Sequence, residues 1–189
     1  MIDQAYEILR DRGLVDWSVL LLGVKGALLK DPERLSGRFV AEYATAELAN
    51  TRTVDPGFAS IAVLSMDDNR SPDETVQLVE DVCRSRPVNT ALALRKWRAA
   101  LIKNSFDNLD VHPLYGHLQL MEIWSTWDWP DDAPLSMRKN SVAPKQGEFG
   151  SQDAFLRAKQ ETACWLDEEF TALKQLSHGL SGPHCDHPE

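Results

Sequence analysis

Helical patterns follow one another along most of the chain, whereas patterns typical of β-strands are scarce. Apolar residues recur three or four positions apart, the spacing of one face of an α-helix. The strongest start signal is Ser71-Pro72-Asp73-Glu74, which combines an N-cap serine, a proline at the first helical position and a glutamate placed for a capping box. The sequence therefore predicts an all-α fold, as an irregular bundle or a short α-solenoid of about seven helices.

Two predicted helices carry details that bear on packing. Asp16 is placed to cap a helix running from Trp17 to Leu29, in which Gly23 and Gly26 would let a neighbouring element approach closely. A helix that starts near Thr90 directs Leu94, Trp97 and Leu101 inward. Its other face is expected to be exposed and basic, with Arg95, Lys96, Arg98 and Lys103.

The helix that begins at Pro113 has an unusual apolar pattern. Its apolar residues, from Leu114 to Trp127, cover most of the helix circumference. A helix of this kind is either central in the fold or half covered by a partner.

Length and composition indicate one folded domain. The chain has 189 residues, of which 43% are hydrophobic and 26% charged, a balance typical of folded proteins. We expect a single helical domain over residues 1–177. Residues 130–150 contain three prolines and two glycines without a helical period, so they are expected to form a long loop within it. Residues 178–189 are expected to form a flexible tail.

The negative charge is concentrated in one segment. The net charge is -9, and the stretch from Asp107 to Met137 contains no Lys or Arg. Nucleic acid and anionic membrane surfaces are recognised by clustered cations, so we expect neither as a partner. The six acids of the segment are Asp107, Asp110, Glu122, Asp128, Asp131 and Asp132.

Other sequence features favour a cytoplasmic protein. The three cysteines are widely spaced and form no C-x-x-C pair, so neither a disulfide framework nor a zinc ribbon is indicated. The first residues are acidic and polar, unlike a secretory signal, and no apolar run is long enough to span a bilayer. Cys83 and Cys164 are expected to lie on buried helix faces.

Motifs for nucleotide binding or nucleophilic catalysis are absent, because the sequence contains no G-x-G-x-x-G, G-x-x-x-x-G-K-[ST] or G-x-S-x-G. His112 and His117 are five positions apart and would not face one ion from a helix. The tail residues His184, Cys185 and His187 have suitable ligand chemistry, but nothing there would preorganise them. Whether they are ordered or bind metal stays open.

Carboxylate pairs are adjacent in sequence, as in Asp67/Asp68, Asp131/Asp132 and Glu168/Glu169, and adjacent residues of a helix point in different directions. We therefore predict no catalytic residue, no metal site and no cofactor, and expect that the protein is not an enzyme. An enzyme with a pocket between helices remains an alternative, as does a structural helical scaffold.

One short segment combines aromatic and acidic residues. Three of the six tryptophans lie within six positions, and acids are interleaved with them. Tryptophan is enriched at binding hot spots, and acids around such anchors favour a basic partner. The alternative is that Trp124 and Trp127 pack beneath the following loop. Exposure of Trp127 or Trp129 would favour binding, whereas burial of all three tryptophans would exclude it. The predicted partner-binding residues are Trp124, Trp127, Asp128, Trp129, Asp131 and Asp132.

Several motifs resemble a bacterial family of small helical proteins of unknown function. The family pattern has an early W-x-x-x-x-x-G, a central K-W and an aromatic-x-x-P segment before the final third. The resemblance covers Leu14 to Pro144 and departs at Arg138-Lys139-Asn140, where members continue with aromatic and apolar residues. Its motifs here are Val15-Asp16-Trp17 with Leu22-Gly23, Lys96-Trp97-Arg98 with Leu101, Leu120 to Trp124, and Trp127 to Asp131.

The family has no assigned reaction, but some members lie among polymorphic-toxin immunity genes. The resemblance therefore implies no particular reaction, and an immunity function is the hypothesis that it suggests. We expect a soluble protein-binding module whose partner is a basic protein, with neutralisation of a toxin, such as a nuclease, as the specific hypothesis. The sequence makes no prediction of the oligomeric state.

Overall fold

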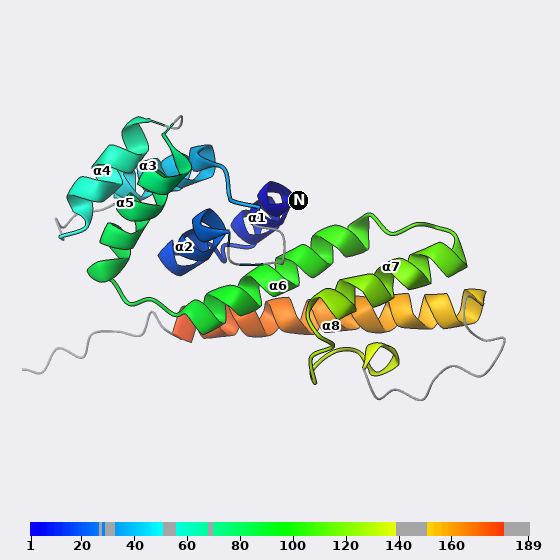
Figure 1. Ribbon diagram of the computed structural model, residues 1–189. Coiled ribbons are helices and arrows are strands. Elements are labelled where there is room, and N and C mark those ends of the chain that lie inside the picture. The colour runs from blue at the N-terminus through cyan, green and yellow to red at the C-terminus, as the bar shows by residue number, and fades with distance from the viewer. Residues whose placement is uncertain (27, 29–32, 51–55, 68–69, 139–150, 180–189) are drawn as a thin grey trace, which may run out of the picture. The chain divides into compact units, whose positions relative to one another are not determined.

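A computed structural model of the chain describes residues 1–26, 28, 33–50, 56–67, 70–138 and 151–179 (Figure 1). These residues form eight α-helices and one short 3-10 helix, η1, and they contain no strand. The prediction of an all-α fold is therefore confirmed. The helices are α1 (Ile2–Asp11), α2 (Trp17–Lys25), α3 (Gly37–Asn50), α4 (Phe58–Met66), α5 (Pro72–Arg84), α6 (Thr90–Asp107), α7 (Pro113–Thr126), η1 (Leu135–Met137) and α8 (Gln152–Gly179).

The chain divides into two compact units, Met1–Leu101 and Ile102–Glu189, and the division falls within α6. The single domain over residues 1–177 stays a prediction. Of the expected loop at residues 130–150, the described part contains η1, and residues 139–150 lie outside the described residues. Most of the expected tail, residues 180–189, also lies outside them.

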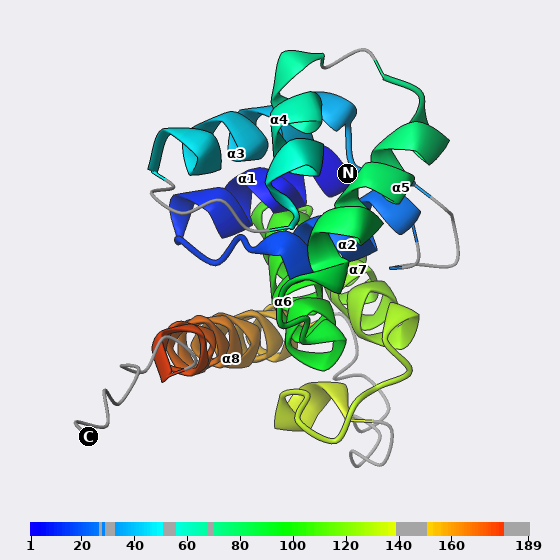
Figure 2. The same ribbon diagram turned by 90° about the vertical axis from the view of Figure 1, so that its left-hand side faces the viewer.

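Helix caps organise the first unit. The Asp16 carboxylate accepts the Val19 N–H at 2.9 Å and begins α2 as predicted. The Ser71 hydroxyl accepts the Glu74 N–H at 3.3 Å and begins α5. Only the serine half of the predicted capping box is seen, because the Glu74 carboxylate pairs with Arg70. In this unit α3 packs on α4, and α5 packs on both α4 and α2 (Figure 2).

The two glycines predicted inside the second helix have different roles. Gly23 permits the close approach that we expected, since a Cβ there would lie 2.8 Å from Cζ2 of Trp97. Gly26 is not inside the helix: its left-handed backbone, with φ of 67°, ends α2 at Lys25. The predicted extension to Leu29 is therefore wrong, because glycine adopts this helix-ending conformation at little cost.

In the second unit α7 lies along α8 (Figure 1). Near the start of α7, a Cβ on Gly116 would come within 2.5 Å of the Phe155 ring, so glycine is required for this approach. Near its end, Trp124 meets Trp165 edge to face, with ring centroids 4.9 Å apart. Residues near the starts of the two helices contact each other, and so do residues further along each helix. The two helices α7 and α8 therefore run parallel. The 3-10 helix η1 packs on both.

No helix within the described ranges is long and apolar enough to cross a membrane.

Candidate functional site

The predicted partner-binding residues lie at the C-terminal end of α7, but they differ in exposure. Trp124 is fully buried against Trp165 of α8, so its side chain offers no surface to a partner. Trp127 and Trp129 are partly exposed. The condition that would exclude binding, burial of all three tryptophans, is not met, and the binding role stays a prediction. The three aspartates, Asp128, Asp131 and Asp132, are exposed.

Backbone hydrogen bonds define how α7 ends. The Trp129 N–H donates to the Trp124 carbonyl at 3.1 Å, and the Asp128 N–H donates to the Ser125 carbonyl at 3.0 Å. This pair of bonds is the Schellman motif, in which the residue at the Asp128 position adopts a left-handed conformation and is usually glycine. The partly exposed Trp129 is thereby tied to Trp124, which is itself packed in the core of the second unit.

Two consecutive residues of this turn have left-handed backbone. Asp128 has φ of 54° and Trp129 has φ of 52°, and they are the non-glycine residues with positive φ among those described. Trp129 also precedes Pro130, and a residue before proline favours an extended conformation. Such conformations cost on the order of 1–3 kcal/mol each and persist only where the surroundings enforce them. The turn is therefore strained at two of the predicted binding residues.

The electrostatics of this end of α7 favour a cation. The last turn of α7 has no basic residue, although a helix C-terminus carries partial negative charge and is usually balanced by Lys or Arg. The adjoining carboxylates of Asp128, Asp131 and Asp132 add to that negative potential, and the segment from Asp107 to Met137 supplies no cation. We call Trp127 to Asp132 the acidic-aromatic turn.

A second polar cluster, which the sequence did not predict, lies in the first unit. Lys96 is 2% exposed, and its Nζ donates to Asp16 Oδ2 at 2.6 Å. The prediction that Lys96 lies on an exposed basic face is wrong, because the ammonium group is buried against a carboxylate that lies far away in sequence. Leu94, predicted to point inward, is exposed instead.

The same cluster includes Trp17, Glu47 and Arg86. The Trp17 indole N–H donates to Glu47 Oε2 at 2.6 Å, and Arg86 pairs with the other oxygen of that carboxylate. The guanidinium of Arg86 also lies 5.8 Å from the Trp17 ring centroid. Each of these charges has a partner of opposite sign within the cluster, which is the arrangement of a structural network.

Two of the motifs that resemble the bacterial family meet in this part of the first unit. Asp16 pairs with Lys96, and the indole N–H of Trp97 donates to the Val19 carbonyl at 2.9 Å. Trp97 also fills the space that a side chain on Gly23 would need. The early W-x-x-x-x-x-G and the central K-W thus form one contact region between α2 and α6.

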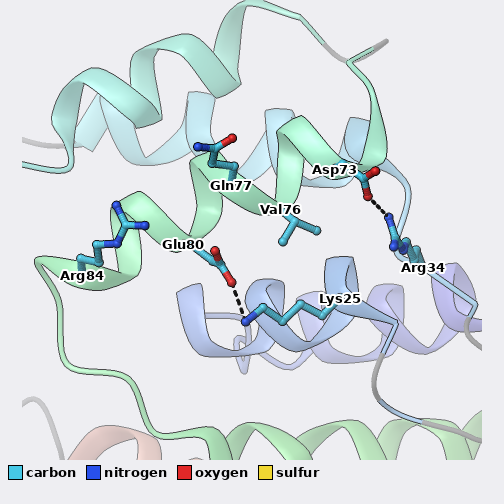
Figure 3. A pocket seen from close by; sticks show the side chains of 7 residues that line it. All are labelled: Lys25, Arg34, Asp73, Val76, Gln77, Glu80 and Arg84. Atoms are coloured by element: carbon cyan, nitrogen blue, oxygen red, sulfur yellow. Dashed lines mark hydrogen bonds and ion pairs between the residues drawn. The ribbon is translucent and has the colours of Figure 1, made fainter.

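A groove of about 370 Å³ lies between α2 and α5 (Figure 3). Lys25 Nζ pairs with Glu80 at 2.7 Å, and Arg34 pairs with Asp73 at 2.8 Å. The hydrogen bond from Lys25 holds the pKa of Glu80 below its usual value. These groups are solvent-exposed ion pairs, which contribute little to stability, and they do not converge on a point where a substrate atom would react.

The histidines and cysteines do not form a metal site within the described residues. No three His, Cys, Asp or Glu groups there lie close enough to share an ion. His117 is buried, and burial lowers its pKa. Burial raises the pKa of the partly buried Cys83 to about 11. Cys164 is exposed, so the prediction that it is buried is wrong. The tail residues His184, Cys185 and His187 lie outside the described residues.

Comparison with known proteins gives one family. A family described as "Uncharacterized protein conserved in bacteria (DUF2247)" matches residues 6–170. The match extends over both compact units and includes the contact region between α2 and α6 as well as the acidic-aromatic turn. No curated protein and no solved structure matches the chain.

Proposed function

The chain belongs to the conserved bacterial family DUF2247, and we propose that this member is a protein-binding module that captures a basic protein through the acidic-aromatic turn. The observation that carries the proposal is the strained turn at the end of α7. It holds two partly exposed tryptophans beside three exposed aspartates, at the negative end of a helix that has no basic residue in its last turn.

Each component of the turn has a defined role in binding. The partly exposed Trp127 and Trp129 would bury further apolar surface, and their indoles lose little conformational entropy when fixed. The backbone bond from Trp129 to Trp124 fixes the turn before the partner arrives, which reduces the ordering cost of association. The aspartates would pair with Lys or Arg of the partner and accelerate its encounter.

The specific form of the proposal is an immunity protein that neutralises a basic toxin. A nuclease is the best example of such a toxin, because an enzyme that acts on a polyanion requires a cationic surface. The cation-free stretch from Asp107 to Met137 would cover that surface. A toxin that acts on nucleic acid would be met in the cytoplasm, which is where we expect this protein to act.

The proposal is tested by binding to the purified product of the neighbouring gene, measured by calorimetry and by pull-down. Trp129→Ala is expected to weaken binding about thirtyfold, a hot-spot loss of roughly 2 kcal/mol. The reversal Asp131→Lys with Asp132→Lys is expected to reduce the association rate, most strongly at low salt. Circular dichroism would establish that both variants fold.

A control is available near the start of α8, where Asp153 is also exposed and lies 12 residues, about 18 Å along the helix, before Trp165. Asp153→Lys, compared with the single reversal Asp131→Lys, changes the net charge equally and is expected to leave binding within about twofold, because surface charges distant from an interface are screened. Equal loss in these two single reversals would show a general charge effect. Unchanged binding in Trp129→Ala and in the Asp131/Asp132 reversal would exclude the acidic-aromatic turn. Absence of binding by the unmodified protein would exclude that toxin.

A further inference from the structure

The exposed side of α7 carries an apolar stripe next to the acidic-aromatic turn. Tyr115 is 57% exposed, Leu118 is 44% exposed and Leu114 is 36% exposed. Val111, just before the helix, is 92% exposed. The spacing of three or four residues places these side chains on one side of α7, while Gly116, Leu120 and Trp124 are buried on the other. We call Val111, Leu114, Tyr115 and Leu118 the α7 stripe.

Local contacts hold the α7 stripe in place. The Asp110 N–H donates to the side-chain oxygen of Gln119 at 2.7 Å, and the Asp110 carboxylate accepts the His112 N–H at 2.7 Å. The His112 ring lies 5.0 Å from the Tyr115 ring, centroid to centroid. The segment before α7 is thus fastened to the helix, and the stripe presents four exposed apolar side chains on one side. Patches of this kind mark interaction sites.

The α7 stripe continues into acidic surface along the same side of the helix. Glu122 and Ser125 follow Leu118 at the same helical spacing, and both are exposed. The acidic-aromatic turn comes next, so apolar groups lie at one end and carboxylates at the other. From Leu114 to Thr126 this surface extends about 18 Å at 1.5 Å per residue. A partner helix of roughly 12 residues has the same length.

A second copy of this chain does not fit the surface. Each copy would bring its own Glu122 and its own acidic turn to the interface, with a net charge of -9 on each chain and no cation between Asp107 and Met137 to offset them. Like charges placed together oppose association. The occupant that complements the surface combines apolar side chains with cations.

We infer that the partner binds as a cationic amphipathic helix laid along α7, with its apolar side chains on Leu114, Tyr115 and Leu118 and its Lys or Arg residues at Glu122 and the acidic-aromatic turn. The inference rests on the proposed function and names the structure that the basic partner presents. Recognition of this kind uses side chains three and four positions apart as anchors.

The test uses two fluorescein-labelled peptides of about 18 residues made of Leu and Lys. In one, Leu recurs at i, i+3, i+4 and i+7, which gives a helix with one apolar face. The other has the same composition in an order without an apolar face. The full chain is expected to bind the amphipathic peptide at least about tenfold more tightly than its isomer, as measured by fluorescence anisotropy.

The variants separate the apolar from the acidic contribution. Leu114→Gln with Leu118→Gln is expected to remove the preference between the two peptides. Leu176→Gln is the matched control: Leu176 is 45% exposed and lies about three turns of α8 beyond Trp165, and the preference is expected to persist. Replacement of Asp128, Asp131 and Asp132 by Asn is expected to weaken the binding of both peptides equally.

Failure of this inference is distinguishable from failure of the proposed function. Equal binding of the two peptides by the unmodified protein, or a preference that persists in the Leu114/Leu118 variant, would overturn the helix inference. If the Asn variant nevertheless bound both peptides less tightly than the unmodified protein, the acidic-aromatic turn would stand as a cation-binding surface. If the Asn variant bound both peptides as tightly as the unmodified protein, the inference and the role of the acidic turn would both be overturned.

Discussion

The two units use tryptophans and carboxylates in opposite ways. In the first unit, the Trp17 N–H donates to Glu47 and the Trp97 N–H donates to the Val19 carbonyl, while the Asp16 carboxylate pairs with Lys96. At the end of α7 in the second unit, two tryptophans are partly exposed and three aspartates are exposed. In the first unit, nearby cations give the carboxylates a structural role. Lys96 and Arg86 pair with the carboxylates of the first cluster, whereas the three aspartates of the acidic-aromatic turn are exposed and the segment from Asp107 to Met137 contains no Lys or Arg.

Substitutions in the two regions are expected to change different properties of the protein. Changes in the contact region between α2 and α6 are expected to lower the free energy of unfolding. Changes in the acidic-aromatic turn are expected to alter binding and to leave stability nearly unchanged or improved.

The largest expected effect is that of Trp97→Ala. Trp97 is fully buried, its N–H donates to the Val19 carbonyl, and its ring packs against Gly23. Its truncation leaves a cavity and removes the indole hydrogen bond, so we expect the free energy of unfolding to fall by about 3–5 kcal/mol. Urea denaturation followed by circular dichroism measures this change. The exposed Leu94 on the same helix is the control, and Leu94→Ala is expected to cost less than about 1 kcal/mol. A loss below about 1 kcal/mol for Trp97→Ala would contradict the proposed importance of this contact.

The second-largest expected effect is a difference in stability between the variants that remove one or the other partner of the Asp16–Lys96 pair. The Lys96 side chain is 2% exposed, whereas that of Asp16 is 44% exposed. Asp16→Ser keeps an N-cap residue but cannot reach Lys96, which leaves a buried ammonium without its carboxylate and is expected to cost about 3 kcal/mol. Lys96→Met removes the buried charge and leaves Asp16 in contact with water, so its cost is expected to stay within about 1 kcal/mol.

Thermal or urea unfolding of both variants at neutral pH gives the comparison. Equal losses would mean that water reaches the Lys96 ammonium in the folded protein, and the expected difference in stability would then be wrong. A double variant, Asp16→Ser with Lys96→Met, serves as the control, because removing both charges is expected to recover most of the stability lost in Asp16→Ser.

Much of the fold could be predicted because its signals are local. The caps at Asp16 and Ser71 and the proline that begins α7 act within a few residues of their position, and the structure contains the helices that they indicate. The burial of Lys96 could not be predicted from helical periodicity, because it depends on Asp16, 80 positions away. The end of α2 was missed for a local reason: Gly26 was assigned to the helix interior, although it could equally serve as a C-cap.

The candidate site could likewise be predicted only in part, because some of its features depend on residues far away in the sequence. Composition and order along the chain were sufficient to locate the tryptophans and acids around Trp127. They were not sufficient to predict which of these side chains are exposed, because Trp124 is buried by Trp165, which follows much later in the sequence. The left-handed turn at Asp128 and Trp129 also gave no signal, because glycine, the usual residue of such a turn, is absent.

The smallest expected effect concerns Asp128, and it addresses the reason for the strained turn. Asp128 has φ of 54° at the position where a Schellman motif usually has glycine. Asp128→Gly and Asp128→Ala both remove the carboxylate, but only glycine relieves the left-handed strain, so the glycine variant is expected to be the more stable by about 1 kcal/mol. Differential scanning calorimetry measures the difference, and equal stability of the two variants would show that the turn is not strained at this residue. If glycine also exceeds the natural aspartate in stability while both variants bind the basic partner less tightly, then the carboxylate is kept at a cost to folding. That result would place Asp128 with residues selected for binding, unlike Asp16, whose carboxylate stabilises the fold.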